Sequence, residues 1–321
     1  MIFLPEVNLA QRLTARLELH PPVDVAQLVK RYAHLEEARF PVDVDGICLD
    51  LKVAGKRPRV IINSNKPENR IRFTLAHELG YILIPWHVGS IVDETDLDED
   101  EFDDYWQIEN EANRFASELL MPQTWMEQLL QATSNPLKAL SELVQEAVVS
   151  VQAATIKMLN MLPPGHLMVQ LDNGFVVSSK KSPATLASPP PVGTQIDVDL
   201  VFPWTDRWQQ EIGGRHYVWW EFRADIAVPI IQTDREWRDI LNDIITDLSP
   251  PEDLKFKATL NGIIAHANGC VRENRTAGAI LDACLQRLYS NAVENFYIEK
   301  FLAHDLFDEF MAVRIQSLLK S

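Results

Sequence analysis

Residues 71–84 read IRFTLAHELGYILI, and this stretch decides the fold of the first half of the chain. Its apolar residues recur at the three- and four-residue spacing of a helix with one buried face, which makes Phe73, Leu75, Leu79 and Ile82 available for burial. A polar break precedes the stretch and a proline follows it directly, so we expect a helix that ends there.

The same helix carries His77 and Glu78, the first two residues of an HExxH pattern. In such a pattern, histidines at positions i and i+4 lie on one helix face and hold one zinc ion, while the glutamate activates a water molecule. Here Tyr81 occupies the place of the second histidine. The pattern makes His77 a candidate metal ligand, Glu78 a candidate general base and Tyr81 a candidate ligand of an unusual kind.

A second helix is predicted after an acidic stretch at 93–104, where residues 108–122 read IENEANRFASELLMP. Its apolar stripe consists of Ala112, Phe115, Ala116 and Leu119.

The segment FTLAHELG at 73–80 and this second segment together resemble the signature helices of the ImmA/IrrE family of zincin-like metallopeptidases. The resemblance covers roughly residues 8–160 and includes the strand-like run RVIINSN at 59–65.

This resemblance implies a small α+β zincin fold, with zinc as cofactor and a third, acidic metal ligand from the second helix. Glu109 is the first choice for that ligand, because Asn113 follows it one turn later, and Glu111 is the alternative. The run at 59–65 is expected to line the cleft and to pair through its edge with an extended peptide. The family's peptidases act on helix-turn-helix repressors and so switch on stress or mobile-element genes.

Tyr81 weakens the expected metal site, because a catalytic zinc normally has three protein ligands and a phenol has a pKa of about 10. We expect zinc binding to be weak or absent. His87 stands at the spacing of the third histidine of HExxHxxGxxH sites, but Ile84 replaces the glycine that turns the chain there, so His87 is a lesser candidate ligand. The chain has kept a modified metal site, has kept only peptide binding, or carries a variant of an active site. Retention of Glu78 favours the first or the third.

The whole chain is expected to divide into three domains and to form an α+β protein overall. Residues 1–162 form the zincin-like domain with a helical extension, in which 139–161 resembles a helix-turn-helix pair; 163–232 is β-rich; 233–321 is helical. Asn173-Gly174 predicts a hairpin turn. Further strands are expected at 194–202, 216–222 and 224–231, and residues 1–40 are expected to be helical.

The net charge of −16 argues against direct nucleic-acid binding and favours a basic protein partner. No apolar run approaches the roughly 18 residues that cross a membrane, and the first residues do not read as a signal peptide. The three cysteines, Cys48, Cys270 and Cys284, show no paired spacing. We therefore expect a cytoplasmic protein without a membrane segment.

These observations lead to one main hypothesis, a zinc-dependent endopeptidase that acts on a regulatory protein such as a helix-turn-helix repressor. The alternative is a catalytically inactive pseudopeptidase that binds a regulator through the same cleft. A third hypothesis, DNA binding through 139–161, is opposed by the acidic balance, since Lys157 is the only basic residue between Leu140 and Leu162.

Overall fold

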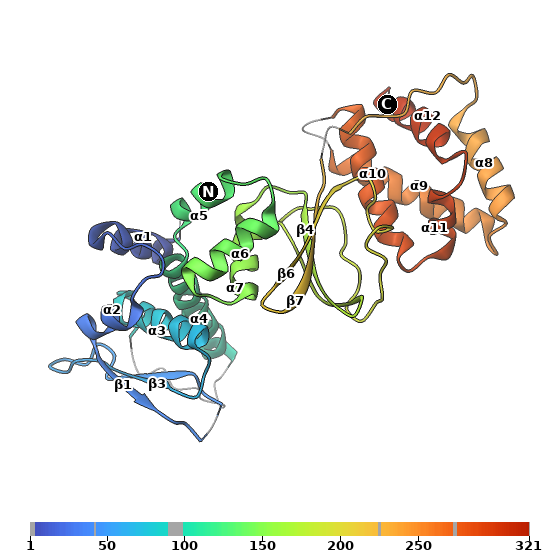
Figure 1. Ribbon diagram of the computed structural model, residues 1–321. Coiled ribbons are helices and arrows are strands. Elements are labelled where there is room, and N and C mark those ends of the chain that lie inside the picture. The colour runs from blue at the N-terminus through green and yellow to red at the C-terminus, as the bar shows by residue number, and fades with distance from the viewer. Residues whose placement is uncertain (1–3, 42, 89–98, 224–225, 272–274, 321) are drawn as a thin grey trace. The chain divides into compact units, whose positions relative to one another are not determined.

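The computed structural model describes residues 4–41, 43–88, 99–223, 226–271 and 275–320. The chain forms two compact units, Met1–Met158 and Leu159–Ser321 (Figure 1). The helices of the first unit are α1 (Pro5–Leu17), α2 (Val25–Tyr32), α3 (Glu68–Leu83), α4 (Glu99–Leu120), α5 (Gln123–Gln131), α6 (Pro136–Ala147) and α7 (Val151–Met161), the last of which runs across the boundary. The acidic stretch at 93–104 was expected to be a loop, and this is wrong for 99–104, because α4 begins at Glu99; residues 93–98 lie outside the described residues.

The first unit contains a three-stranded sheet in the order β1 (His34–Ala38), β3 (Arg59–Asn63), β2 (Gly46–Leu49). Strand β1 runs parallel to β3, and β2 runs antiparallel to it. The prediction that β3 is the cleft-lining edge strand was wrong, because β1, which was expected to be helical, pairs with its second edge. Among the described residues, β1 and β2 are the two outer strands of this sheet.

Helices α3 and α4 pack closely, and their predicted apolar faces are confirmed in large part. Leu75, Leu79 and the four stripe residues of α4 are buried, whereas Phe73 and Ile82 are only half-buried. Gly80 permits the close approach, since a Cβ there would lie 3.2 Å from Phe115 Cδ1 and 3.4 Å from Ala112 Cα.

The C-terminal end of α3 is held by Lys52, from the connection between β2 and β3. The Lys52 ammonium donates to the backbone carbonyls of Ile84 and His87, and more weakly to that of Tyr81 at 3.4 Å. A cation at this end satisfies carbonyls that have no partner within the helix. Lys52 thus fixes the end of α3 at which Tyr81 lies.

The predicted helix-turn-helix-like pair is present as α6 and α7, separated by residues 148–150. Lys157, on α7, lies 2.5 Å from the carboxylate of Glu118 on α4, and both side chains are largely buried. This ion pair joins the helical extension to α4.

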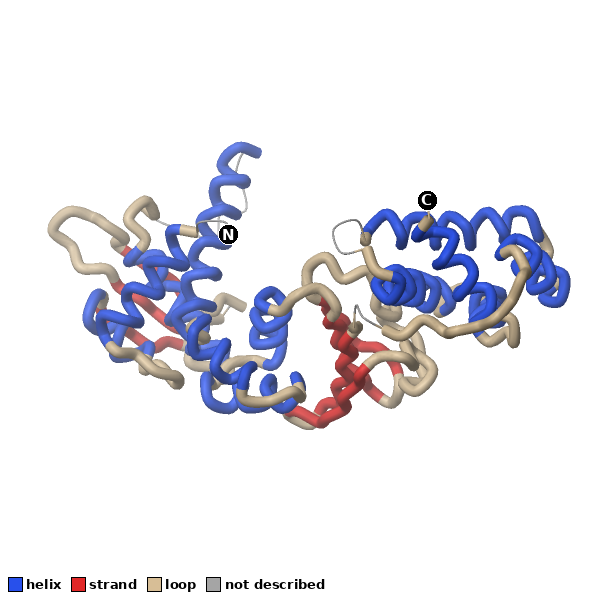
Figure 2. The backbone as a smooth tube through the Cα atoms, turned by 90° about the horizontal axis from the view of Figure 1, so that it is seen from above, coloured by secondary structure: helices blue, strands red, loops and turns tan. Residues whose placement is uncertain are grey.

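The second unit begins with an antiparallel sheet in the order β5-β4-β7-β6, formed by β4 (His166–Asp172), β5 (Phe175–Lys181), β6 (Asp206–Ile212) and β7 (Arg215–Glu221) (Figure 2). The predicted hairpin turn at Asn173-Gly174 is confirmed, with positive φ at both residues. The strand expected at 194–202 is wrong, since only one isolated bridge joins Gln195 to Phe175. Residues 226–231 are likewise not a strand, while β6 was not predicted.

In the described residues, the second unit ends with the helices α8 (Trp237–Leu248), α9 (Asp253–Cys270), α10 (Ala277–Ala292), α11 (Phe296–Leu302) and α12 (Phe307–Leu319), which surround an apolar core. Gln286 on α10 accepts from the backbone N–H of Ala187 at 2.9 Å, and Tyr289 lies with its ring 4.6 Å from that of Trp204. The β-rich and helical parts thus contact one another within one unit. Their division into separate domains at 163–232 and 233–321 stays a prediction.

Within the described ranges, no helix is both long and apolar enough to cross a membrane. All three cysteines are free thiols. Cytoplasmic localisation stays a prediction.

Candidate active site

A cleft of about 570 Å³ lies between α3, α4, strand β2 and the residues that precede β2. Four of the predicted site residues line it, namely His77, Glu78, Tyr81 and Glu109. Helix α3 supplies the first three, because residues one turn apart share a face, and α4 supplies Glu109 from the opposite wall.

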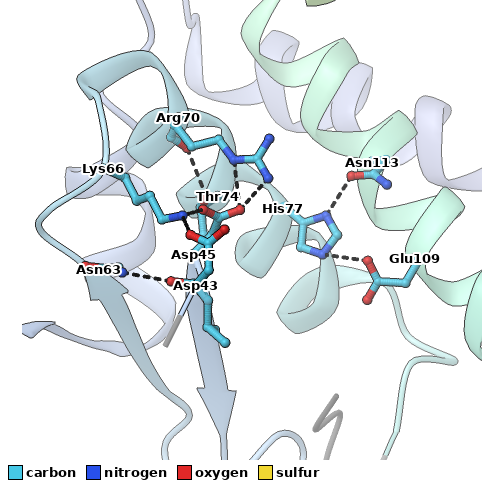
Figure 3. Close-up of polar contacts among 10 residues, drawn as sticks. Asp43, Asp45, Asn63, Lys66, Arg70, Thr74, His77, Glu109 and Asn113 are labelled. Atoms are coloured by element: carbon cyan, nitrogen blue, oxygen red, sulfur yellow. Dashed lines mark hydrogen bonds and ion pairs between the residues drawn. The ribbon is translucent and has the colours of Figure 1, made fainter. Parts of the chain in front are cut away.

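The His77 ring is held by a hydrogen bond at one nitrogen, and its other nitrogen faces Glu109 (Figure 3). Nδ1 donates to Asn113 Oδ1 at 3.0 Å, and Nε2 lies 3.5 Å from Glu109 Oε2. Burial lowers the pKa of His77, which favours the neutral ring. With its proton on Nδ1, the ring presents the Nε2 lone pair towards Glu109, the arrangement that a metal-binding histidine requires. Asn113 therefore orients His77, although its spacing had suggested a role beside Glu109.

Tyr81 reaches the same carboxylate from one turn further along α3. Its hydroxyl donates to Glu109 Oε1, and its ring lies edge-on to that of His77 with centroids 4.7 Å apart. The imidazole, the carboxylate and the phenol therefore converge on one place.

Glu78 lies beside this group and is buried. Burial, followed by the nearby charge of Glu109, raises its pKa to about 8. Strand β2 approaches this carboxylate through Gly46, where a Cβ would lie 2.6 Å from Thr74 Cγ2 and 3.3 Å from Glu78 Oε1. Only glycine lets the edge strand come so near the predicted general base.

His87 and Glu111 form a separate pair outside the cleft lining. His87 is fully buried, with Nε2 2.9 Å from Glu111 Oε2, and that oxygen also accepts from Trp86 Nε1 at 2.5 Å. Gln107 donates to the other oxygen of Glu111 at 3.1 Å. Burial acts to raise the pKa of Glu111, but these hydrogen bonds outweigh it and the pKa is lowered. The pair ties the chain after α3 to α4, so Glu109 rather than Glu111 faces the predicted metal position.

Sequence reasoning missed a charged group at the other end of the cleft. It consists of Asp43 and Asp45 before β2, Lys66 before α3, and Arg70 on α3 (Figure 3). Isolated charged residues in a loop and a helix gave no signal of this pairing.

The described residues contain no group of three His, Cys, Asp or Glu side chains placed to hold a metal ion. Among the described residues that line the cleft, Tyr81 is the remaining side chain that contacts Glu109 beside His77 and would supply a third ligand. Two ligands of a tetrahedral zinc with bonds of 2.0–2.2 Å lie about 3.4 Å apart, close to the 3.5 Å between His77 Nε2 and Glu109 Oε2. The separation of His77 and Glu109 therefore suits zinc, to which Tyr81 would bind as the phenolate.

A helix carrying His-Glu packs on a second helix that brings an acid and an amide, and both helices face an edge strand; this is the arrangement that the sequence led us to expect of a zincin-like domain. Residues 37–159 match the family model Peptidase_M78, described as the IrrE N-terminal-like domain. The chain therefore contains a domain of this peptidase family, as its sequence had suggested. No curated protein matches the chain.

Proposed function

We propose that the chain is a zinc-dependent endopeptidase, with His77, Tyr81 and Glu109 as metal ligands and Glu78 as general base. The observation that carries the proposal is the convergence of His77 Nε2 and Tyr81 Oη on the two oxygens of one carboxylate, Glu109. When bound, zinc would polarise the substrate carbonyl, acidify a water molecule and favour the charged form of Glu78.

Each protein group then has a defined task. Asn113 keeps the His77 proton on Nδ1, so that Nε2 stays available. Glu78 would take a proton from the attacking water at a carboxylate oxygen and return it to the nitrogen of the leaving peptide. Burial and the charge of Glu109 raise the pKa of Glu78 to about 8, and a bound cation would lower it again, so that the carboxylate is ionised when the water attacks.

The substrate would bind as an extended peptide against strand β2. One edge of β2 pairs with β3, and residues 46–48 line the cleft. An added strand gains backbone hydrogen bonds whatever its sequence, which suits a protein substrate. The net charge of −16 favours a basic partner, and a regulatory protein such as a helix-turn-helix repressor in the cytoplasm fits the family.

The proposal is tested by loading the purified full chain with zinc and following cleavage of a mixed peptide library by mass spectrometry. We expect cleavage that stops on chelation and falls at least about a hundredfold in Glu78→Gln. Glu68→Gln, an exposed glutamate on the same helix but outside the cleft, is the matched control and should retain full activity. Equal activity of Glu78→Gln and the unchanged chain would contradict the assignment.

A second candidate is a peptide-binding pseudopeptidase. It is favoured by the hydrogen bond that the Tyr81 hydroxyl donates to Glu109. A phenol that keeps its proton leaves only His77 and Glu109 as conventional ligands. This candidate predicts peptide binding without zinc and without cleavage. Metal content after dialysis against zinc separates the two candidates.

A further inference from the structure

The charged end of the cleft is held rigidly. Asn63 donates its side-chain N–H to the carbonyl of Val44 at 2.9 Å, and its backbone N–H to the carbonyl of Asp45 at 2.9 Å. Lys66 contacts the carboxylates of both Asp43 and Asp45, the latter at 3.2 Å. These contacts tie the segment leading into the edge strand to the end of β3 and to the chain before α3.

Arg70 is fixed by the same group but keeps donors to spare. Its Nε donates to Asp45 Oδ2 at 2.8 Å, and its Nη2 donates to the same oxygen. A guanidinium has five N–H donors, so the pair formed by Nη1 and the second N–H of Nη2 is left over. Within the described part of the chain, no protein acceptor contacts Nη1, and the Arg70 side chain is 59% exposed.

The position of Arg70 relates it to the reacting end of the cleft. Arg70 and His77 line the same cleft and lie on the same side of α3 (Figure 3). They are seven residues apart, or about 10 Å along the helix, which is the length of about three residues of an extended peptide. A peptide on β2 that reaches the metal ligands therefore also reaches Arg70.

At this end of the cleft, the group available to a ligand is a hydrogen-bond donor, the Arg70 guanidinium, rather than a carboxylate acceptor. Both carboxylates, Asp43 and Asp45, already have cationic partners, while the free edge of Arg70 has two parallel N–H groups. Such a fork matches the two oxygens of a carboxylate. A lysine in the same place would offer only a point charge.

We propose that Arg70 determines substrate specificity by binding a carboxylate of the peptide in the cleft, two or three residues from the predicted site of cleavage. The carboxylate comes from an acidic side chain or from a peptide C-terminus. This inference rests on the proposed peptide binding along β2, and it is tested without requiring cleavage.

The test measures which peptides the cleft retains. The full chain carrying Glu78→Gln, which leaves bound peptides intact, is immobilised and incubated with random decapeptides blocked at both ends. Retained peptides are sequenced by mass spectrometry. We expect Asp and Glu to be enriched roughly fivefold at one position, and Arg70→Gln to abolish the enrichment. A second library, with free C-termini and no acidic side chains, shows whether a terminal carboxylate is bound instead.

Arg59→Gln is the matched control. Arg59 also pairs with a carboxylate through Nε and Nη2, at 3.0 and 3.1 Å from the two oxygens of Glu36, and it is 43% exposed but lies outside the cleft lining. Its variant should retain the preference. If Arg70→Gln does not fold, Arg70→Lys is measured instead, and it should lose part of the enrichment because it keeps the charge without the fork.

Lysine or arginine in place of acidic residues at the enriched position, an unchanged preference in the Arg70 variant, or no selective retention would overturn the inference. Cleavage by the unchanged chain is scored in a separate reaction. A chain that retains acidic peptides but cleaves none would contradict the proposed peptidase and leave the role of Arg70 supported.

Discussion

Substitution of Gly46 by alanine tests the close approach of the edge strand to the site helix. The added Cβ would lie 2.6 Å from Thr74 Cγ2, whereas ordinary van der Waals contacts begin at 3.4 Å. Thr74 is buried on α3 and donates to the carbonyl of Arg70 at 3.0 Å, so it cannot turn away without losing that bond. Overpacking of this kind costs about 1–3 kcal/mol. We expect a loss of about 2 kcal/mol in the local free energy of unfolding.

The compensating change is Thr74→Ser, which removes the clashing methyl group and keeps the hydroxyl. The next contacts of the new Cβ are Glu78 Oε1 at 3.3 Å and Ile61 O at 3.5 Å, which are close to ordinary. The double variant should therefore be more stable than the sum of the single changes by at least about 1 kcal/mol. Hydrogen exchange of peptides from β2 and α3, measured by mass spectrometry, reports this free energy.

Gly262→Ala provides the control, since a Cβ at this position in α9 meets nothing within 4 Å. It should stabilise its helix by up to about 1 kcal/mol. Strict additivity of Gly46→Ala and Thr74→Ser, or a harmless Gly46→Ala, would refute the proposed packing of β2 on α3.

Three further predictions follow from single side chains. Tyr81→His should raise zinc affinity at least about tenfold in calorimetric titration, since a neutral imidazole need not lose a proton; unchanged affinity would count against Tyr81 as a ligand. Burial raises the pKa of Asp282 to about 6 from 3.8, so the folded chain holds a proton that the unfolded chain has lost, and stability should fall by up to about 3 kcal/mol as the pH rises from 4 to 7. Urea unfolding of Asp282→Asn should lack that fall; an identical pH profile would exclude Asp282 as its cause. Glu118→Gln should destabilise the first unit by about 3 kcal/mol, because it leaves the Lys157 ammonium buried without its counter-charge. Near-neutral behaviour in the same urea assay would contradict this.

The fold was predictable where one segment carries its own periodic pattern. The helices around His77 and Glu109 carry apolar stripes that can be recognised within each segment, and most of these residues are buried in the structure. Strand β1 reads HLEEA and has no such pattern, since it becomes a strand only by pairing with β3. The DVD run at 197–199 suggested a strand, but Asp197 accepts from the backbone N–H of Asp199 at 3.0 Å and turns the chain.

The site shows the same contrast between residues that a local sequence pattern predicts and residues whose place depends on distant contacts. His77 and Glu78 followed from the spacing of the HExxH pattern on one helix, and Glu109 from the resemblance of the second helix to a family signature. Arg70 did not, because its place in the cleft depends on Asp45, which lies 25 residues earlier in the chain. Spacing alone also made His87 a candidate ligand, whereas the structure places its Nε2 on the buried carboxylate of Glu111.

Zinc soaking of crystals of the full chain, with anomalous diffraction recorded at the zinc edge, tests the central claim most directly. We expect one strong anomalous peak about 2.0–2.2 Å from His77 Nε2, from an oxygen of Glu109 and from Tyr81 Oη. The absence of a peak in this cleft at saturating zinc, or a peak coordinated by other side chains, would contradict the proposed metal centre.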